Sequence, residues 1–199
     1  MKKWIAVFCA SAAGVHGEYM EQAQTMGRTI AERGYGLVYG GATVGTMGAV
    51  ASAALDAGGA VMGVIPEVLR EREIEHRGLA ELHVVRSMHE RKAMMAGRAD
   101  AFLALPGGYG TLDEFIEVLT WAQLRIHTKP CVLVNVRGYY DGLLTFLDTG
   151  VAEGFLKPEN RELIRVASDA EDGLRVLEEL WAAQGAAEAH DARLDELVQ

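Results

Sequence analysis

The sequence predicts an α/β protein: a single-domain, doubly wound Rossmann-like fold with a parallel sheet of about six or seven strands and helices on both faces. Short runs rich in β-branched and aromatic residues alternate with longer segments whose apolar residues recur at three-to-four spacing, as in repeated βαβ units. Most of the short runs are apolar almost throughout, as strands buried on both faces should be. With 199 residues, of which 50% are hydrophobic and 24% charged, the chain suits one domain with its own core.

Each element follows from its local pattern. The apolar runs predict six strands and a candidate seventh, at 3–10, 36–39, 60–65, 81–86, 101–105, 132–136 and 163–167. The amphipathic segments predict helices at 18–33, 46–57, 87–99, 111–125, 140–150 and 168–184. Residues 1–185 then make up the domain. Residues 186–199 are polar with a weak helical pattern, and we expect a frayed C-terminal tail there.

Composition excludes several classes of function. The formal charge of −9, from 19 Lys and Arg against 28 Asp and Glu, argues against a broad nucleic-acid-binding surface. No run approaches the roughly 20 apolar residues that a membrane-spanning helix needs. The apolar run that follows Lys2 and Lys3 is short and fits a first strand better than a signal peptide. Cys9 and Cys131 lie inside apolar runs, which is typical of buried thiols in a reducing compartment, so we expect a cytoplasmic protein.

Three strand-to-helix turns are rich in Gly, Ser and Thr, at residues 9–14, 40–48 and 106–111. Glycine lets a backbone approach a ligand closely, and the N–H groups at a helix start attract phosphate. The alternative is that these glycines only make tight turns and let helix pack on strand. The turns lack the GxxxxGK[ST] and GxGxxG patterns, and the chain lacks HExxH and CxxC. We therefore expect a mononucleotide or sugar phosphate as ligand, with no metal and no cofactor.

Two charged segments lie beside those turns. Arg91 and Lys92 begin a helix directly after a strand, where adjacent cations can hold a phosphate and the guanidinium offers a two-pronged contact. The alternative for both is a solvated first helical turn. Thr111 and Glu114 follow the third glycine turn, and T-x-x-E is the spacing of a capping box, in which the two side chains satisfy backbone N–H groups.

The same capping-box spacing occurs at Ser87 and Glu90 and at Ser168 and Glu171. Spacing alone therefore favours a capping role for Glu114 over a catalytic one. Its position beside a glycine turn and near Arg91 keeps the catalytic alternative open.

The segments Ser87-Met88-His89-Glu90-Arg91-Lys92 and Pro106-Gly107-Gly108-Tyr109-Gly110-Thr111-Leu112-Asp113-Glu114 together resemble the SMHERK and PGGxGTxxE motifs of the LOG (Lonely Guy) family. These are the cytokinin riboside 5′-monophosphate phosphoribohydrolases. The similarity continues through YGGATVGTMGAVA, ADAFLALPGG, TWAQLRIHTKP and NVRGYYDGLL, and covers roughly residues 3–167. It implies hydrolysis of the N-glycosidic bond of a nucleoside 5′-monophosphate to free base and ribose 5-phosphate. Many members carry the older label lysine decarboxylase, but nothing in the sequence indicates pyridoxal phosphate chemistry.

The resemblance also implies site residues. Arg91 and Glu114 take the catalytic positions: Glu114 would stabilise positive charge on the ribose and orient water, and Arg91 would hold phosphate or ribose hydroxyls. The N–H groups of Gly108, Gly110 and Thr111 would cradle the 5′-phosphate. The implied substrate contacts are Glu73, Arg91, Lys92, Gly108, Tyr109, Gly110, Thr111, Leu112, Asp113, Glu114 and Thr120. In the other two turns, Ser11, Gly45 and Gly48 remain as phosphate or base contacts.

Some questions stay open from the sequence. Ala10 and Ala12 in the first turn, and Ala42 and Thr43 in the second, depart from the family pattern, so the substrate is AMP, an N6-prenylated AMP or both. A non-catalytic nucleotide or molybdenum-cofactor carrier of the same fold is the main alternative, and a nucleotide-sensing dimer is another. The family resemblance implies at least a homodimer. Trp121 and Leu124 are candidates for its interface, with ordinary core positions as the alternative.

Overall fold

The computed structural model describes residues 2–70, 79 and 81–198, with side chains described through residue 187. The sheet consists of β1 (Trp4–Phe8), β2 (Gly36–Tyr39), β3 (Ala60–Pro66), β4 (Glu81–Val85), β5 (Ala101–Ala104), β6 (Cys131–Val134) and β7 (Ile164–Ala167). The helices are α1 (Gly17–Glu32), α2 (Gly45–Asp56), α3 (Met88–Arg98), α4 (Tyr109–Gln123), α5 (Asp141–Ala152), α6 (Pro158–Arg161) and α7 (Ala170–Val198). Two 3₁₀ turns, η1 (Glu67–Leu69) and η2 (Val136–Gly138), follow β3 and β6.

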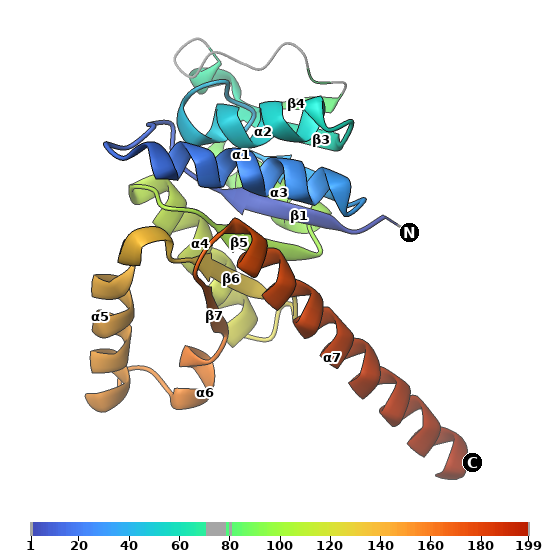
Figure 1. The fold of residues 1–199 in the computed structure, drawn as a ribbon. Helices are drawn as coiled ribbons and strands as arrows, with labels where there is room; N and C mark the ends of the chain where they lie inside the picture. The colour runs from blue at the N-terminus through green and yellow to red at the C-terminus, as the bar shows by residue number, and fades with distance from the viewer. Residues whose placement is uncertain (1, 71–78, 80, 199) are drawn as a thin grey trace.

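The seven strands are parallel and lie in the order β4-β3-β2-β1-β5-β6-β7. The chain starts in the middle of the sheet, moves out to one edge at β4, and returns to build the other half from β5 (Figure 1). The order therefore reverses between β1 and β5. The predicted doubly wound fold is confirmed, and the candidate seventh strand is its second edge.

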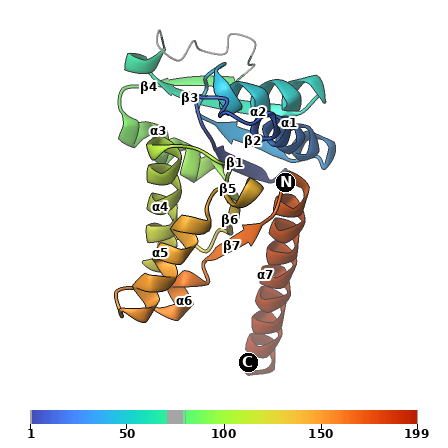
Figure 2. The same cartoon turned by 60° about the vertical axis from the view of Figure 1, so that its left-hand side comes forward.

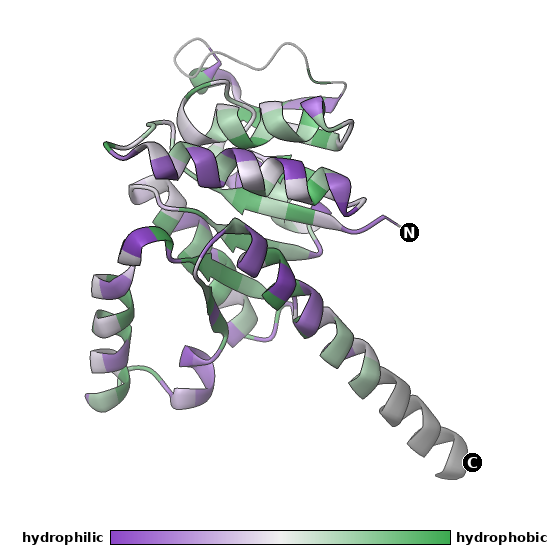
Figure 3. Cartoon of the chain, in the orientation of Figure 1, coloured by the Kyte–Doolittle hydropathy of each residue, from purple (hydrophilic) through white to green (hydrophobic). Residues whose placement is uncertain are grey.

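Helices cover both faces of the sheet, as Figure 2 shows. One buried cluster joins α1, α2 and α7 to alternate strand residues such as Ile5, Leu37 and Leu103. The other joins α3 and α4 to the intervening residues, such as Ala6 and Phe102. Every residue of β1, β2, β5 and β6 is buried, because helices pack on each side of these central strands. Figure 3 shows the resulting hydrophobic sheet beneath hydrophilic outer helix surfaces.

The C-terminal segment differs from the sequence prediction. Helix α7 does not end near residue 184 but runs without a break to Val198 (Figure 1), so residues 186–198 are helical rather than a frayed tail. Local composition accounts for the difference. Residues 186–198 contain several Ala, Leu and Glu, which are strong helix formers, and hold neither Gly nor Pro. The high helix propensity of these residues therefore extends α7, although their apolar periodicity is weak.

One of the three predicted capping boxes forms as predicted, at the start of α3. Ser87 Oγ accepts a hydrogen bond from Glu90 N at 3.1 Å, as predicted, and the Glu90 carboxylate accepts one from the backbone N–H of Arg86. At α7 the arrangement is shifted by one residue. Asp169 accepts from Asp172 N at 2.9 Å, while the predicted Ser168–Glu171 pair does not cap, because the helix starts at Ala170.

Helices α1 and α2, which cover the same face of the sheet, approach each other closely at Gly27. A Cβ built on Gly27 would lie 2.0 Å from the backbone oxygen of Val50, so only glycine fits. We expect Gly27→Ala to lower the free energy of unfolding by about 3 kcal/mol, at the upper end of overpacking costs, because the obstruction is backbone. Gly97→Ala is the matched control. Gly97 lies inside α3 with nothing within 4 Å of its Cβ position, and alanine there should stabilise by about 0.5 kcal/mol. Urea unfolding of both variants measures the difference, and equal effects would contradict this packing.

Candidate active site

The carboxyl ends of the central strands carry a cavity of about 270 Å³. Its walls come from the loop after β1, the start of α2, the first turns of α3, and the loop and first turns of α4. This edge, where the strand order reverses, is where ligands of doubly wound sheets bind. Arg91 and Glu114 both line the cavity, so the structure brings the two predicted catalytic residues together.

The guanidinium of Arg91 is held by backbone oxygens at the ends of two strands. Its Nε donates to Val64 O at 3.1 Å and its Nη2 donates to Gly40 O at 3.0 Å. Only 5% of the residue is exposed, and a buried guanidinium needs such acceptors. The two-pronged grip on phosphate stays a prediction: Nε and one N–H of Nη2 bond to the main chain, which leaves Nη1 and the second N–H of Nη2 for a ligand. Arg91 Nη1 lies 4.0 Å from Met88 Sδ, and both residues line the cavity.

Glu114 approaches Arg91 from α4. Its Oε1 lies 3.9 Å from Arg91 Nη1, which is close enough for charge attraction but too long for a hydrogen bond. Both side chains are about nine-tenths buried. Cys9 lies at the same wall, where the pKa of its thiol is raised to about 12. Burial is the main cause and Glu114 adds to it, while Thr46 and Arg91 act in the opposite direction. Cys9 is therefore a neutral thiol and no nucleophile.

The start of α4 decides what Thr111 and Glu114 do. The helix begins at Tyr109 with Gly108 as its N-cap, so Thr111 is the third residue of the helix. The capping-box interpretation of Thr111 and Glu114 is wrong, because the Pro106–Gly108 turn starts the helix earlier than the T-x-x-E spacing indicates. Glu114 lies about one turn inside the helix and turns toward Arg91 instead.

Two kinds of hydrogen-bonding group at this helix start face the cavity. The first N–H groups of α4 have no carbonyl one turn earlier to bond, which makes a helix N-terminus suited to anions. Within the described part of the chain, the buried hydroxyl of Thr111 has no hydrogen-bond partner. A Cβ on Gly107 would lie 2.1 Å from that hydroxyl, so the glycine leaves room for it. The arrangement is suited to a phosphate group.

Several residues implied by the family resemblance lie outside the cavity walls. Lys92 and Asp113 form an ion pair between α3 and α4. Thr120 lies exposed about three turns after the start of α4, where its hydroxyl donates to Ile116 O. Leu112 packs on the core of that face of the sheet. Tyr109 lines the cavity but is 95% exposed. Glu73 lies outside the described residues.

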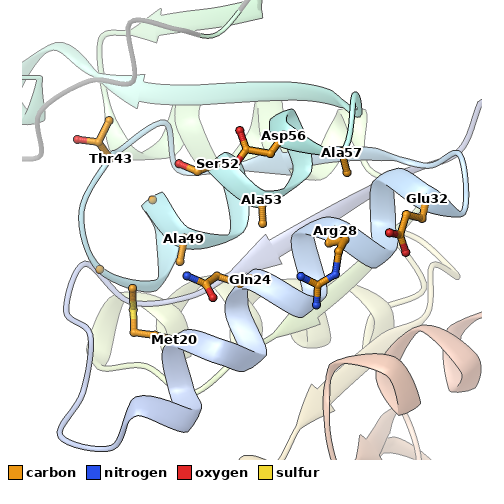
Figure 4. Close-up of a pocket in the computed structure, with 12 residues that line it drawn as sticks. Met20, Gln24, Arg28, Glu32, Thr43, Ala49, Ser52, Ala53, Asp56 and Ala57 are labelled. Carbon is orange, nitrogen blue, oxygen red and sulfur yellow. The ribbon is translucent and has the colours of Figure 1, made fainter.

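The other two glycine turns divide between the cavity and a separate groove. Ser11 lines the Arg91 cavity, whereas Gly45 and Gly48 line a groove of about 730 Å³ between α1 and α2 (Figure 4). A Cβ on Gly45 would lie 2.3 Å from the backbone of Ser11, and one on Gly48 would lie 2.0 Å from Thr43 O. These two glycines therefore permit close loop packing, which was the alternative interpretation for them.

Sequence reasoning missed the residues that hold Arg91 in place. Gly40 is the main one: a Cβ there would lie 2.1 Å from Arg91 Nη2. Its φ is not in the left-handed region, so the glycine is needed for space. The sequence signal was the Gly40-Gly41 pair directly after a strand. Met47 and Met88 also line the cavity, and their helical spacing gave no sign of this.

No cluster of three or more His, Cys, Asp or Glu side chains suited to a metal ion occurs among the described residues. Nor does any helix in residues 2–70 and 81–198 combine the length and apolar character needed to cross a membrane.

Comparison with known proteins agrees with the sequence motifs. A family model described as "Possible lysine decarboxylase" matches residues 47–177. A cytokinin riboside 5′-monophosphate phosphoribohydrolase of Arabidopsis thaliana is 52% identical over 177 residues, covering 89% of this chain and 82% of the relative. The enzyme of the same name from Rhodococcoides fascians is 50% identical, covering 88% and 89%. The molybdenum cofactor carrier protein of Chlamydomonas reinhardtii superposes with a TM-score of 0.70 at 24% identity, covering 92% and 99%.

The fold and the site together define a class of protein. It is a doubly wound α/β domain with a buried carboxylate and guanidinium beside a helix N-terminus. Within that class, the chain belongs to the LOG family, as its motifs predicted. The likeness to the carrier protein, at 24% identity, concerns the fold alone.

The substitution Gly40→Ala tests whether activity depends on the position of the Arg91 guanidinium. The added methyl group would occupy the space of Nη2, and a displacement of about 1 Å at a reacting centre costs about a hundredfold in rate. We therefore expect kcat/KM for nucleoside monophosphate hydrolysis to fall about a hundredfold. Gly97→Ala, on the same helix as Arg91 but open to solvent, should keep full activity. Full activity of Gly40→Ala would show that Arg91 does not need this position.

Proposed function

We propose that this chain hydrolyses the N-glycosidic bond of a nucleoside 5′-monophosphate, releasing free base and ribose 5-phosphate. The substrates are an N6-modified cytokinin riboside 5′-monophosphate, AMP or both. The observation that carries the proposal is the Arg91–Glu114 pair, 3.9 Å apart and buried in one cavity with the N-terminus of α4. The names of relatives about 50% identical to the chain support it.

The helix α4 supplies the spacing that the substrate needs. The 5′-phosphate binds the N–H groups of Gly110 and Thr111 and the Thr111 hydroxyl, which otherwise has no partner in the described chain. Glu114 follows Thr111 by three residues, so its carboxylate lies about one turn, or ~5 Å, further along the helix. That offset supports a role for the carboxylate beside the ribose of a nucleotide whose phosphate binds at the helix start.

The reaction itself is a displacement at C1′. The bond from C1′ to the base nitrogen breaks, the base leaves with that electron pair, and a water oxygen bonds to C1′. Glu114 stabilises the positive charge that develops on the ribose and takes a proton from the water. That proton then passes to the base nitrogen, which holds the electron pair of the broken bond, so Glu114 is ionised again. Arg91 directs Nη1 at the ribose hydroxyls and fixes the sugar against Glu114.

We infer that the chain acts as a homodimer. Helix α5 contains no buried residue, and Phe146 on it is 69% exposed. Leu124, after α4, is 62% exposed, which rules out the core alternative for it, whereas Trp121 packs on the core. Large exposed apolar patches mark association surfaces, and these exposed side chains are the candidates for one here.

We place the protein in the cytoplasm. Cys9 and Cys131 are both buried free thiols, which suits a reducing compartment.

Glu114→Gln tests the catalytic proposal. Purified protein is incubated with AMP, N6-isopentenyl-AMP and the riboside that lacks phosphate, and products are separated by chromatography. We expect free base from the monophosphates, little from the riboside, and about a thousandfold loss in Glu114→Gln, because Gln cannot accept the proton. Glu32→Gln, on the exposed face of α1, is the control and should remain active.

The outcomes of this assay separate the alternatives. Saturable binding of a monophosphate with no base released would contradict the hydrolase and favour the carrier. A rise in melting temperature with nucleotide, again without product, would favour the nucleotide sensor.

The dimer surface is tested by Phe146→Asp and Leu124→Asp. A charge buried in an interface without a partner strongly opposes association, so light scattering should show monomers for these variants and dimers for the natural sequence. Val15→Asp, at a 93% exposed position before α1, should remain dimeric. A natural sequence that scatters as a monomer would contradict the dimer.

A further inference from the structure

Lys92 follows Arg91 directly, but the structure gives it different neighbours. Its Nζ lies 3.2 Å from Asp113 Oδ2 and 3.1 Å from Glu117 Oε1, both on α4. The side chain is only 13% exposed. Burial alone lowers the pKa of Lys92, but the two carboxylates outweigh it and raise the pKa overall. Lys92 therefore carries its positive charge while lying outside the walls of the Arg91 cavity.

The charges around Lys92 disfavour a third anionic partner. One ammonium group faces two carboxylates, so the three groups together carry a net negative charge. A substrate phosphate brought to the same ammonium would meet repulsion from both carboxylates. A phosphate ligand would need Lys92 to abandon Glu117, which is three-quarters buried with it.

The position of the two ion pairs indicates a structural role for Lys92. Lys92 and Arg91 are consecutive on α3, and Asp113 and Glu114 are consecutive on α4. The ion pairs of Lys92 thus join the same two helices at the level of the Arg91–Glu114 gap. That gap is 3.9 Å, longer than a hydrogen bond, so its width depends on how α3 and α4 are held.

We propose that Lys92 is a positioning residue, whose ion pairs with Glu117 and Asp113 hold α3 against α4 and set the separation of Arg91 from Glu114. This role rests on the proposed hydrolase function. It differs from the substrate contact that the family resemblance implies for Lys92. Glu117 is the stronger partner, because its side chain is 25% exposed against 58% for Asp113, and exposed ion pairs contribute little.

A charge exchange tests the proposal. The natural sequence, Lys92→Met, Lys92→Glu, Glu117→Lys and the double variant Lys92→Glu/Glu117→Lys are assayed with AMP and N6-isopentenyl-AMP. We expect Lys92→Met to lower kcat about tenfold with less than a threefold change in KM. Lys92→Glu should lose more than a hundredfold, and the double variant should regain at least tenfold over Lys92→Glu, because the exchanged pair restores attraction.

Inorganic phosphate as an inhibitor separates the two roles. For a positioning residue, the inhibition constant of phosphate should change less than threefold in Lys92→Met. A tenfold rise in that constant and in KM, with kcat unchanged and no recovery in the double variant, would overturn the proposal and make Lys92 a phosphate ligand.

Failure of the hydrolase proposal would be distinguishable. If the natural sequence releases no base, melting temperatures of Lys92→Met, Glu117→Gln and their combination still report the ion pair. The link between α3 and α4 is supported if the combined variant lowers the melting temperature by less than the two single variants added together. Additive losses would overturn it.

Discussion

The site depends on how one guanidinium is buried at the end of the sheet. The ladder between β2 and β3 ends at the pair Tyr39 and Gly63, while β3 continues beside β4 as far as Pro66. Gly40 and Val64 would be the next pair in that register, and their backbone oxygens instead accept hydrogen bonds from Arg91. Because a buried charge is costly without such acceptors, this early end of one ladder fixes where the cation can lie.

Two adjacent glycines make that arrangement possible in different ways. Gly41 has a φ of +80°, so it supplies the left-handed turn that leads the chain away from β2. Gly40 has no such conformation and instead lacks the Cβ that would meet Arg91. Before α4, Gly107 likewise leaves space for the Thr111 hydroxyl, and Gly108 is the N-cap of the helix. In both turns, glycine adjusts the position of a functional group on another element.

The fold could be predicted from the sequence because periodicity and burial agree in every central strand. The site could be predicted only in part. Spacing favoured a capping role for Glu114. Its position beside a glycine turn and near Arg91 kept a catalytic role open, and the family resemblance then indicated Arg91 and Glu114 as a catalytic pair. Helix starts decide such roles, and a shift of one or two residues, as at Tyr109 and Ala170, changes which side chain caps. Consecutive residues also diverge by about 100° around a helix, so Arg91 and Lys92 have different neighbours.

A chain with a formal charge of −9 can still favour a phosphate, because its attraction for anions is local. Arg91 is offset by Glu114, and Lys92 by Asp113 and Glu117, so the side chains around the site supply no excess of positive charge. What remains is the row of N–H groups at the start of α4 and one buried hydroxyl. Such donors act over a short range and in fixed directions. Discrimination for a monophosphate then comes from geometry at the helix start rather than from long-range attraction to any polyanion.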